Sequence, residues 1–233
     1  PVHVCSQCET AVAYNEIEYH KVSDPSIFII FPLKDEKNTF FLVWTTTPWT
    51  LVSNTGIMAN PKADYVKVKF ENSTEKLILA KDLVETISQK LGKKYKILDS
   101  FHGSKLKDVK YSHPFSDAIP FSEDIDKTGY KVVMSEQFVN LEDGSGLVHC
   151  APGHGQEDFK VGNENGLPVY SPVGMNGTYN ENCGKFSYIY VKDADKIIIA
   201  IGSSNVTNKE NPLSYDRRKE MLEKVIENEG ISN

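Results

Sequence analysis

The sequence has no apolar run long enough to cross a bilayer. The longest lies around Ile197–Ile201, whereas a transmembrane helix needs about 20 consecutive apolar residues. The opening residues, Pro1-Val2-His3-Val4, have neither the basic start nor the apolar stretch of a secretory signal peptide. The first residue is not methionine, which predicts a piece of a longer protein. Together these absences predict a cytoplasmic protein that does not engage membranes.

Cysteine is also scarce, with four residues at positions 5, 8, 150 and 183. An even count in a chain of this length, without a signal peptide, does not indicate a disulfide framework. Cys5 and Cys8 have half the spacing of a zinc ribbon, but no second cysteine pair follows them. Because a closed structural zinc site needs four ligands, we expect no metal in this chain.

An excess of positive charge is missing too. The net charge of −6 does not indicate the basic stripe that is typical of nucleic-acid-binding domains. Two lysine clusters, over 90–96 and 105–110, are either solvated surface or local contacts with RNA. If RNA is a substrate, this chain is expected to hold only its end. The length of 233 residues allows one large domain or two small ones.

Short apolar segments separated by turn residues predict many strands. We expect strands over 26–33, 39–45, 56–59, 65–70, 76–80, 95–101, 130–134 and 147–150, the first two forming a hairpin. We expect helices over 47–54, 82–91, 156–165, 191–201 and 214–228, and a loop over 112–127. Pro48 suits the first position of its helix, and Gly92 and Gly166 suit helix ends. The fold class predicted is α+β and mostly β, a barrel-like core of short strands with a few peripheral helices.

The segment Trp44-Thr45-Thr46-Thr47-Pro48-Trp49-Thr50 contains four threonines, one proline and the only two tryptophans of the chain. Hydroxyl groups donate and accept hydrogen bonds without titrating near neutral pH, so the cluster can hold a water molecule and a substrate oxygen. Two indoles can exclude water from what lies between them. The alternative is a strand end whose threonines reflect β propensity. The flanking tryptophans favour a site.

A glycine-rich segment about a hundred residues later, Gly144–Phe159, contains His149 and Asp158. Asp158 falls in the first turn of an expected helix, where it either stabilises the helix dipole or binds a substrate ammonium group. His149 is either a buried core histidine or the wall of a side-chain pocket. His154 lies between two glycines, and we expect a loop residue there and not a catalyst. The segment lacks the nucleophile elbow of the hydrolases, and nothing in the chain matches a phosphate loop or a dinucleotide fingerprint.

Both segments resemble the signature motifs of the editing domain, connective peptide 1, of isoleucyl-tRNA synthetases. Sister domains for valine and leucine typically have Arg-Pro followed by an acidic residue and Thr where this chain has Thr47-Pro48-Trp49-Thr50, which favours the isoleucine branch. The resemblance covers about 16–201. Val52, Cys150 and Glu157 replace commoner residues without removing a group that the chemistry needs. The stretches that carry the resemblance are 16–20, 44–51, Asn54, 56–61, 64–65, 144–167, 172–174, 177–179 and 191–195.

The resemblance implies hydrolysis of valine wrongly esterified to tRNA(Ile). A binding pocket distinguishes one methylene by only about 1–3 kcal/mol, and isoleucyl-tRNA synthetase is the standard example of this limit. A second site is therefore needed that accepts valine, rejects isoleucine and hydrolyses the ester. It further implies that Asp158 binds the α-ammonium group and that His149 shapes a side-chain pocket. The other implied site residues are Thr45, Thr46 and Thr47 for the terminal adenosine, the ester and the attacking water, and Trp44, Trp49 and Thr50 for substrate binding.

The implied partners are the 3′ acceptor end of tRNA(Ile) carrying valine and the rest of the synthetase chain. No cofactor is implied in this domain; the parent synthetase uses ATP and Mg elsewhere, and this chain lacks the HIGH and KMSKS motifs of that site. We expect a strand connecting to the synthetase body over 1–15, the editing domain over 16–203, and a polar connector with a C-terminal helix over 204–233. The alternatives are a non-catalytic module that docks the acceptor end or another protein, an editing domain of a valine or leucine enzyme, and a free-standing deacylase.

Overall fold

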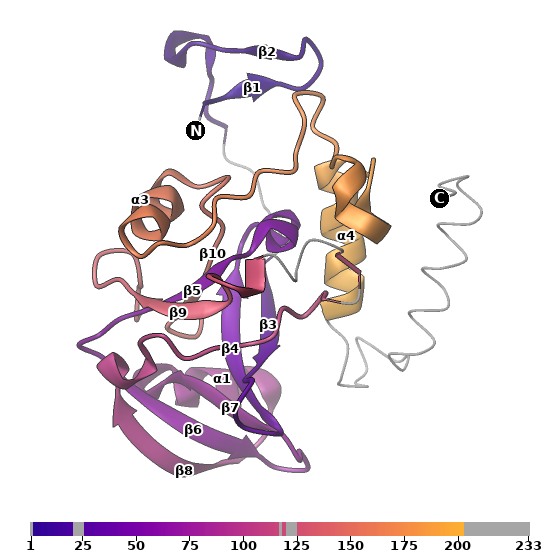
Figure 1. Ribbon diagram of the computed structural model, residues 1–233. Helices are drawn as coiled ribbons and strands as arrows, with labels where there is room; N and C mark the ends of the chain where they lie inside the picture. Colours follow the sequence, from indigo (N-terminus) through magenta and orange to yellow (C-terminus); the bar gives the residue numbers. More distant parts are fainter. Residues whose placement is uncertain (1, 21–25, 117, 120–124, 203–233) are drawn as a thin grey trace.

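The computed structural model describes residues 2–20, 26–116, 118–119 and 125–202, and most of its regular structure is β (Figure 1). A small hairpin and a curled sheet are accompanied by a few helices, of which those named η are short 3-10 helices. In chain order the elements are β1 Val4–Cys5, β2 Thr10–Ala11, η1 Tyr14–Glu16, β3 Ile27–Pro32, β4 Thr39–Thr45, η2 Pro48–Ser53, β5 Gly56–Ala59, β6 Asp64–Phe70, β7 Lys76–Ala80, η3 Lys81–Leu83, α1 Val84–Leu91, β8 Tyr95–His102, η4 Gly103–Leu106, β9 Lys131–Met134, β10 Leu147–Cys150, α3 Gln156–Glu164, η5 Glu181–Phe186 and α4 Val191–Gly202.

The main sheet has the strand order β8-β6-β7-β4-β10-β5-β9, with β3 paired to β4. β3 and β4 form the expected antiparallel hairpin. The start of β4 pairs in parallel with β7, and its end pairs in parallel with β10. β4 is therefore the strand at which two groups of strands meet, β6-β7-β8 and β10-β5-β9.

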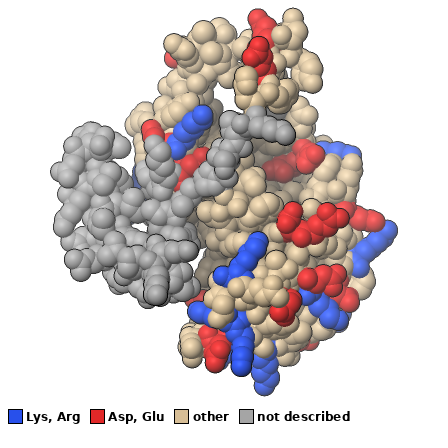
Figure 2. Space-filling view, turned by 180° about the vertical axis from the view of Figure 1, so that it is seen from behind, with Lys and Arg blue, Asp and Glu red and all other residues tan. Residues whose placement is uncertain are grey.

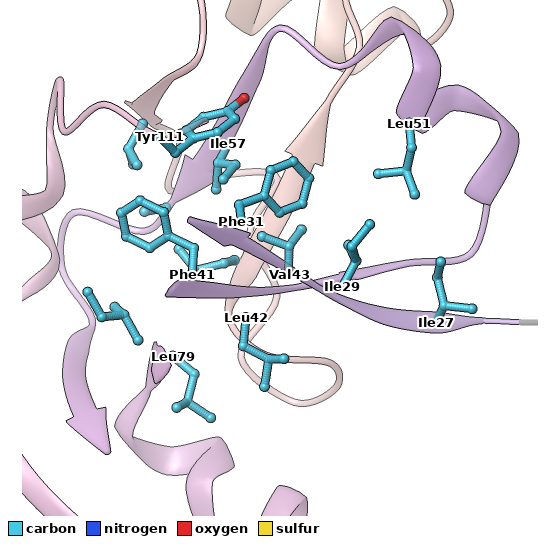
Figure 3. Close-up of a cluster of buried hydrophobic side chains, with 14 of the residues drawn as sticks. Ile27, Ile29, Phe31, Phe41, Leu42, Val43, Leu51, Ile57, Leu79 and Tyr111 are labelled. Atoms are coloured by element: carbon cyan, nitrogen blue, oxygen red, sulfur yellow. The ribbon is translucent and has the colours of Figure 1, made fainter. Parts of the chain in front are cut away.

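The core follows from the period-2 alternation of the hairpin strands. Ile27, Ile29 and Phe31 of β3 are buried on one face, with half-buried residues between them. The residues from Phe41 to Val43 in β4 are all buried, because this strand is covered on both faces. Figure 3 shows these side chains packed with Leu51, Ile57 and Tyr111.

The predicted mostly-β α+β fold is confirmed, and so are most strands. The predicted helix over 82–91 is split into η3 and α1, and it ends at Gly92, whose φ of 60° is left-handed. Gly166 follows the end of α3 with a φ of 64°. Sequence patterns missed η4 and η5, since 3-10 turns of four to six residues leave no hydrophobic periodicity.

The predicted connecting strand over 1–15 is wrong in its local structure. The segment folds back at Ser6–Glu9, so that β1 and β2 pair antiparallel, and η1 follows. The turn is closed by a hydrogen bond from the Glu9 N–H to the Cys5 carbonyl, at 2.8 Å, with Glu9 at a φ of 54°. The domain division itself stays a prediction.

The helix expected over 214–228, and the whole 204–233 segment, lie outside the described residues. Within the described ranges, no helix combines the length and the apolar character that a membrane crossing requires.

Candidate functional site

The parallel pairing of β4 with β10 joins the threonine-rich segment to the histidine segment. Trp44 and Val148 are partners in this register, so Thr45 and His149 are the next residues along the two strands. Because side chains alternate along a strand, Thr45 and His149 share one face and Trp44 and Val148 share the other. Two segments about a hundred residues apart therefore become neighbours at the ends of adjacent strands.

The threonines form a hydrogen-bonded turn. The Thr47 N–H donates to the Thr45 hydroxyl at 3.1 Å, and the Thr50 hydroxyl donates to the Thr47 carbonyl at 2.8 Å. The hydroxyls of Thr47 and Thr50 are 3.2 Å apart. Pro48 opens η2, as expected from its fixed φ, and this helix carries Thr50 inward. Thr45 and Thr50 are buried, whereas Thr46 and Thr47 are exposed.

His149 is the buried centre of this network. Its Nε2 lies 2.7 Å from the Thr50 hydroxyl, and its Nδ1 lies 3.1 Å from the Asn54 amide nitrogen. The same amide nitrogen donates to the Gly56 carbonyl at 2.8 Å, which fixes the orientation of the Asn54 amide. Nδ1 is therefore an acceptor, and Nε2 carries the proton and donates it to Thr50. A neutral histidine with Nε2 protonated has no free acceptor nitrogen with which to act as a general base.

Burial keeps three histidines of this region neutral. It lowers the pKa of His149 to about 3, with smaller contributions from the nearby His113 and His154. Burial also lowers the pKa values of His113 and His154 to about 4. Near neutral pH these imidazoles supply directional hydrogen bonds and no charge.

Asp158 lies in the first turn of α3, as predicted. One of its carboxylate oxygens accepts the Ala151 N–H at 2.9 Å, which ties it to the chain just after β10. The carboxyl group lies against Gly155, where a Cβ would be 2.9 Å from the carboxyl carbon. Burial raises the pKa of Asp158, and adjacent Glu157 adds to the rise. Among the described residues no cation offsets this cost, so the site presents a carboxylate that a bound ammonium group would stabilise.

Trp49 is anchored through its backbone. Its N–H donates to the Asp195 carboxylate of α4 at 2.7 Å, and its carbonyl accepts the Tyr179 hydroxyl at 2.5 Å. The His154 ring meets the indole edge to face, with ring centroids 4.9 Å apart, and His154 Nε2 lies 2.9 Å from the Ser53 hydroxyl. The α4 helix thus helps to fix the loop that carries the threonines.

Trp44 lies apart from this cluster. Its side chain is on the opposite face of the sheet from Thr45 and packs against Gly144, where a Cβ would be 2.8 Å from the ring. The geometry gives Trp44 a packing contact with the glycine loop; its assignment to substrate binding stays a prediction.

Sequence patterns brought Thr45, Thr47, Thr50, His149 and Asp158 into consideration, and the structure places all five around the β4–β10 junction. Thr46 lies in the same turn, exposed, with no side-chain partner among the described residues. Further polar partners were not assigned to the site from the sequence because their contacts depend on the fold, although Tyr179 and Asp195 lie in stretches that carry the resemblance. These partners are Ser53, Tyr111, His113, Tyr179 and Asp195.

The described part of the chain contains no group of three or more His, Cys, Asp and Glu residues that could hold a metal ion. The expectation of no metal and no cofactor in this domain stays a prediction.

No family model matches the chain. The chain is 44 % identical over 205 residues to the isoleucine–tRNA ligase of Pyrococcus horikoshii and 45 % identical over 205 residues to that of Pyrococcus abyssi. Each match covers 85 % of this chain but 19 % of the relative, so the chain spans about a fifth of the length of these enzymes.

Among solved structures, the chain is similar to the crystal structure of GlLeuRS-CP1, with a TM-score of 0.58 and 14 % identity, covering 75 % of this chain and 94 % of that one. An identity this low shows the fold alone. The sequence matches and this fold together identify the chain as a homologue of a segment of isoleucine–tRNA ligases, with the fold of the CP1 editing domains of tRNA synthetases.

Proposed function

We propose that this chain is an editing domain that hydrolyses the ester linking valine to tRNA(Ile), by attack of a positioned water molecule. The observation that carries the proposal is the β4–β10 junction. It holds a neutral threonine–histidine network, and the chain just after β10 holds a desolvated carboxylate that has no cationic partner among the described residues. An aminoacyl ester carries both a hydrophobic side chain and an α-ammonium group, and these two features complement the junction.

Asp158 binds the α-ammonium group of the aminoacyl ester. Burial raises the pKa of this carboxyl group, so its ionised form is costly in the free domain and gains most from a positive partner. The hydrogen bond from the Ala151 N–H holds the carboxylate in place before substrate arrives. Substrates that lack a free α-amino group should be poor.

His149 and Thr50 form the wall of the side-chain pocket, next to Trp49. The one hydroxyl hydrogen of Thr50 goes to the Thr47 carbonyl, and its oxygen accepts from His149 and faces the Thr47 hydroxyl. Thr50 thus has no spare hydrogen to offer a substrate, which suits a hydrocarbon side chain such as that of valine.

Thr45, Thr46 and Thr47 position the terminal adenosine, the ester and the water that attacks its carbonyl carbon. The attack forms a bond from water oxygen to the carbonyl carbon, breaks the ester bond and returns the ribose hydroxyl and free valine. An ester already activated by its α-ammonium group needs no side-chain nucleophile, and correct positioning supplies much of the rate. The protonated Nε2 of His149 supports this reading, since the ring has no free nitrogen with which to accept a proton from water.

The test is deacylation of Val-tRNA(Ile) by the purified chain and by Asp158→Asn, which keeps the shape and removes the charge. We expect the variant to lose roughly 10- to 150-fold in rate, which corresponds to the about 1.5–3 kcal/mol of a hydrogen bond to a charged group. Glu157→Gln, at the exposed neighbouring carboxylate, is the matched control and should retain the rate.

Wild-type rates in Asp158→Asn would remove Asp158 from the mechanism. A wild-type chain that binds the acceptor end but never hydrolyses the ester would instead be a docking module. Loss of hydrolysis on chelation, with recovery on adding zinc, would contradict metal-independent chemistry.

A further inference from the structure

A buried phenol in neither motif ends the hydrogen-bond network of His149. Tyr111 is fully buried, and its hydroxyl lies 2.5 Å from the Asn54 Oδ1. Asn54 in turn contacts His149 Nδ1, so the network runs from the loop after η4, through the residue that follows η2, to β10.

Every hydrogen in this network has one direction. The Gly56 carbonyl can only accept, so the Asn54 nitrogen faces it and the Asn54 oxygen faces Tyr111. Tyr111 therefore donates to Asn54, the second amide hydrogen of Asn54 is directed to His149 Nδ1, and His149 Nε2 donates to Thr50. The Thr50 hydroxyl then donates to the Thr47 carbonyl.

Tyr111 itself is held rigidly. Its ring meets Phe31 edge to face with centroids 5.2 Å apart, and its N–H donates to the Tyr130 carbonyl at 3.0 Å. Figure 3 shows Phe31 and Tyr111 in the same buried cluster. The Tyr111 hydroxyl therefore adds a second constraint to that of the Gly56 carbonyl, because a flipped Asn54 amide would leave buried polar groups unsatisfied.

We propose that Tyr111 is a positioning residue for the proposed hydrolysis: through Asn54 it holds His149 in the Nε2-protonated tautomer and so sets the wall of the side-chain pocket. Without the phenol hydroxyl, Asn54 Oδ1 lacks its donor and only the Gly56 carbonyl still fixes the amide, so the flipped amide, with Oδ1 toward His149, becomes less unfavourable. His149 then also adopts the Nδ1-protonated tautomer, in which Nε2 is an acceptor. The Thr50 hydroxyl must then leave the Thr47 carbonyl to donate to it, which alters the threonine turn.

The consequence for hydrolysis rests on the proposed function, but the tautomer can be measured without substrate. The chain is labelled with 15N-histidine, and long-range 1H–15N spectra report which ring nitrogen of His149 is protonated; His149→Ala assigns the signals. We expect the wild-type chain to be Nε2-protonated and Tyr111→Phe to gain a several-fold larger share of the Nδ1-protonated form.

Tyr130→Phe is the matched control. Tyr130 is a buried neighbour, and the centroid of its ring lies 5.8 Å from that of the Tyr111 ring. Its hydroxyl has no hydrogen-bond partner among the described residues. Removing this hydroxyl should leave the His149 signals unchanged. Deacylation of Val-tRNA(Ile) should fall roughly 2- to 10-fold in Tyr111→Phe, the loss expected for one neutral hydrogen bond, and stay unchanged in Tyr130→Phe.

A wild-type chain with Nδ1 protonated overturns the proposal, and so does a folded Tyr111→Phe with unchanged His149 signals or the same shift in Tyr130→Phe. If Tyr111→Phe does not fold, Asn54→Ala tests the same link, and unchanged signals in that variant overturn it equally. A tautomer shift in Tyr111→Phe with no hydrolysis by any form of the chain would sustain the positioning role and refute the proposed function.

Discussion

The two groups of strands that meet at β4 differ in where they place their polar side chains. The lysine lobe, β6, β7 and β8 with α1, carries its polar groups as surface charges, and Lys69 lies directly opposite Lys76 and Lys96 in the sheet. Figure 2 shows lysines grouped with acidic side chains at the lower end of the molecule, where β6 and β8 lie in Figure 1. The site lobe, β5, β9 and β10 with η2, instead buries neutral polar side chains. They are Thr50, Ser53, Asn54, Thr55 and His149.

The difference separates two uses of polar groups. Surface ion pairs contribute little because water and salt screen them, and they tolerate change. Buried neutral hydrogen bonds are directional and costly to leave unmade, so they fix geometry. The candidate site is built from the second kind, which suits the proposed hydrolysis, since that reaction depends on positioning.

The largest expected effect is on stability in mild acid. His113, His149 and His154, in or against the site lobe, have pKa values lowered by burial to about 4, about 3 and about 4. The contribution of these neutral histidines to the free energy of unfolding is complete above their ordinary pKa of about 6.5. It is lost as the pH falls toward about 4, at up to about 4 kcal/mol per pH unit for the three together. Asp158, whose pKa is raised, offsets part of this loss. Urea unfolding followed by circular dichroism at pH 7, 6 and 5 measures the slope.

His154→Gln removes one of the three histidines, so the dependence of the unfolding free energy on pH should fall by about a third. Added salt should leave this dependence unchanged because the groups are buried. Glu36 lies in the β3–β4 turn, and its hydrogen bond with Lys67 of the lysine lobe, with help from other donors, lowers its pKa to about 2. Its stabilisation is therefore lost only between about 4.5 and 2, and salt should weaken it. If stability fell in one salt-sensitive transition across both pH ranges, the proposed difference between the buried polar groups and the surface charges would be wrong.

The second effect concerns selectivity. If His149 is a wall of the pocket, His149→Ala should begin to hydrolyse Ile-tRNA(Ile) while still cleaving Val-tRNA(Ile). Overpacking a site by one methylene costs about 1–3 kcal/mol, and this cost disappears when the wall is removed. The two rates are measured side by side.

His102→Ala, at an exposed histidine of β8 in the lysine lobe, is the matched control and should change neither rate. Equal loss of both activities in His149→Ala would make His149 a catalytic group, contrary to the tautomer that the hydrogen bonds assign.

The smallest effect belongs to the lysine lobe. Glu36 pairs with Lys67 at 2.6 Å and with Lys76 at 3.2 Å, and about a third of its side chain is exposed. Glu36→Gln should cost about 0.2–1 kcal/mol of unfolding free energy, and less in high salt. A loss of several kcal/mol, measured by the same urea unfolding, would show that the charged surface fixes the fold as strongly as the buried network does.

Sequence patterns predicted the strands and helices better than the contacts between them. The alternation in Ile27–Phe31 and the helix-ending Gly92 are local signals, and local signals can be read without the fold. The threonine and histidine segments were likewise recognisable by composition and by their resemblance to known motifs. The link from Tyr111 to His149 could not be predicted, because it exists only once β10 has found its register on β4. The fold at Ser6–Glu9 was missed because strands of two residues leave no periodic pattern.

The register of Val148 on Trp44 also has a consequence for the order of folding. The β3–β4 and β6–β7 hairpins join residues close in sequence, and β8 pairs with β6 across fewer than 40 residues, whereas the β4–β10 pair closes a loop of about a hundred residues. Because loop-closure entropy must be overcome before distant contacts stabilise the chain, we expect the lysine lobe to form early and the β4–β10 junction late. A growing polypeptide would then complete the β4–β10 junction, the site of the proposed hydrolysis, only after the last strand of the sheet has left the ribosome.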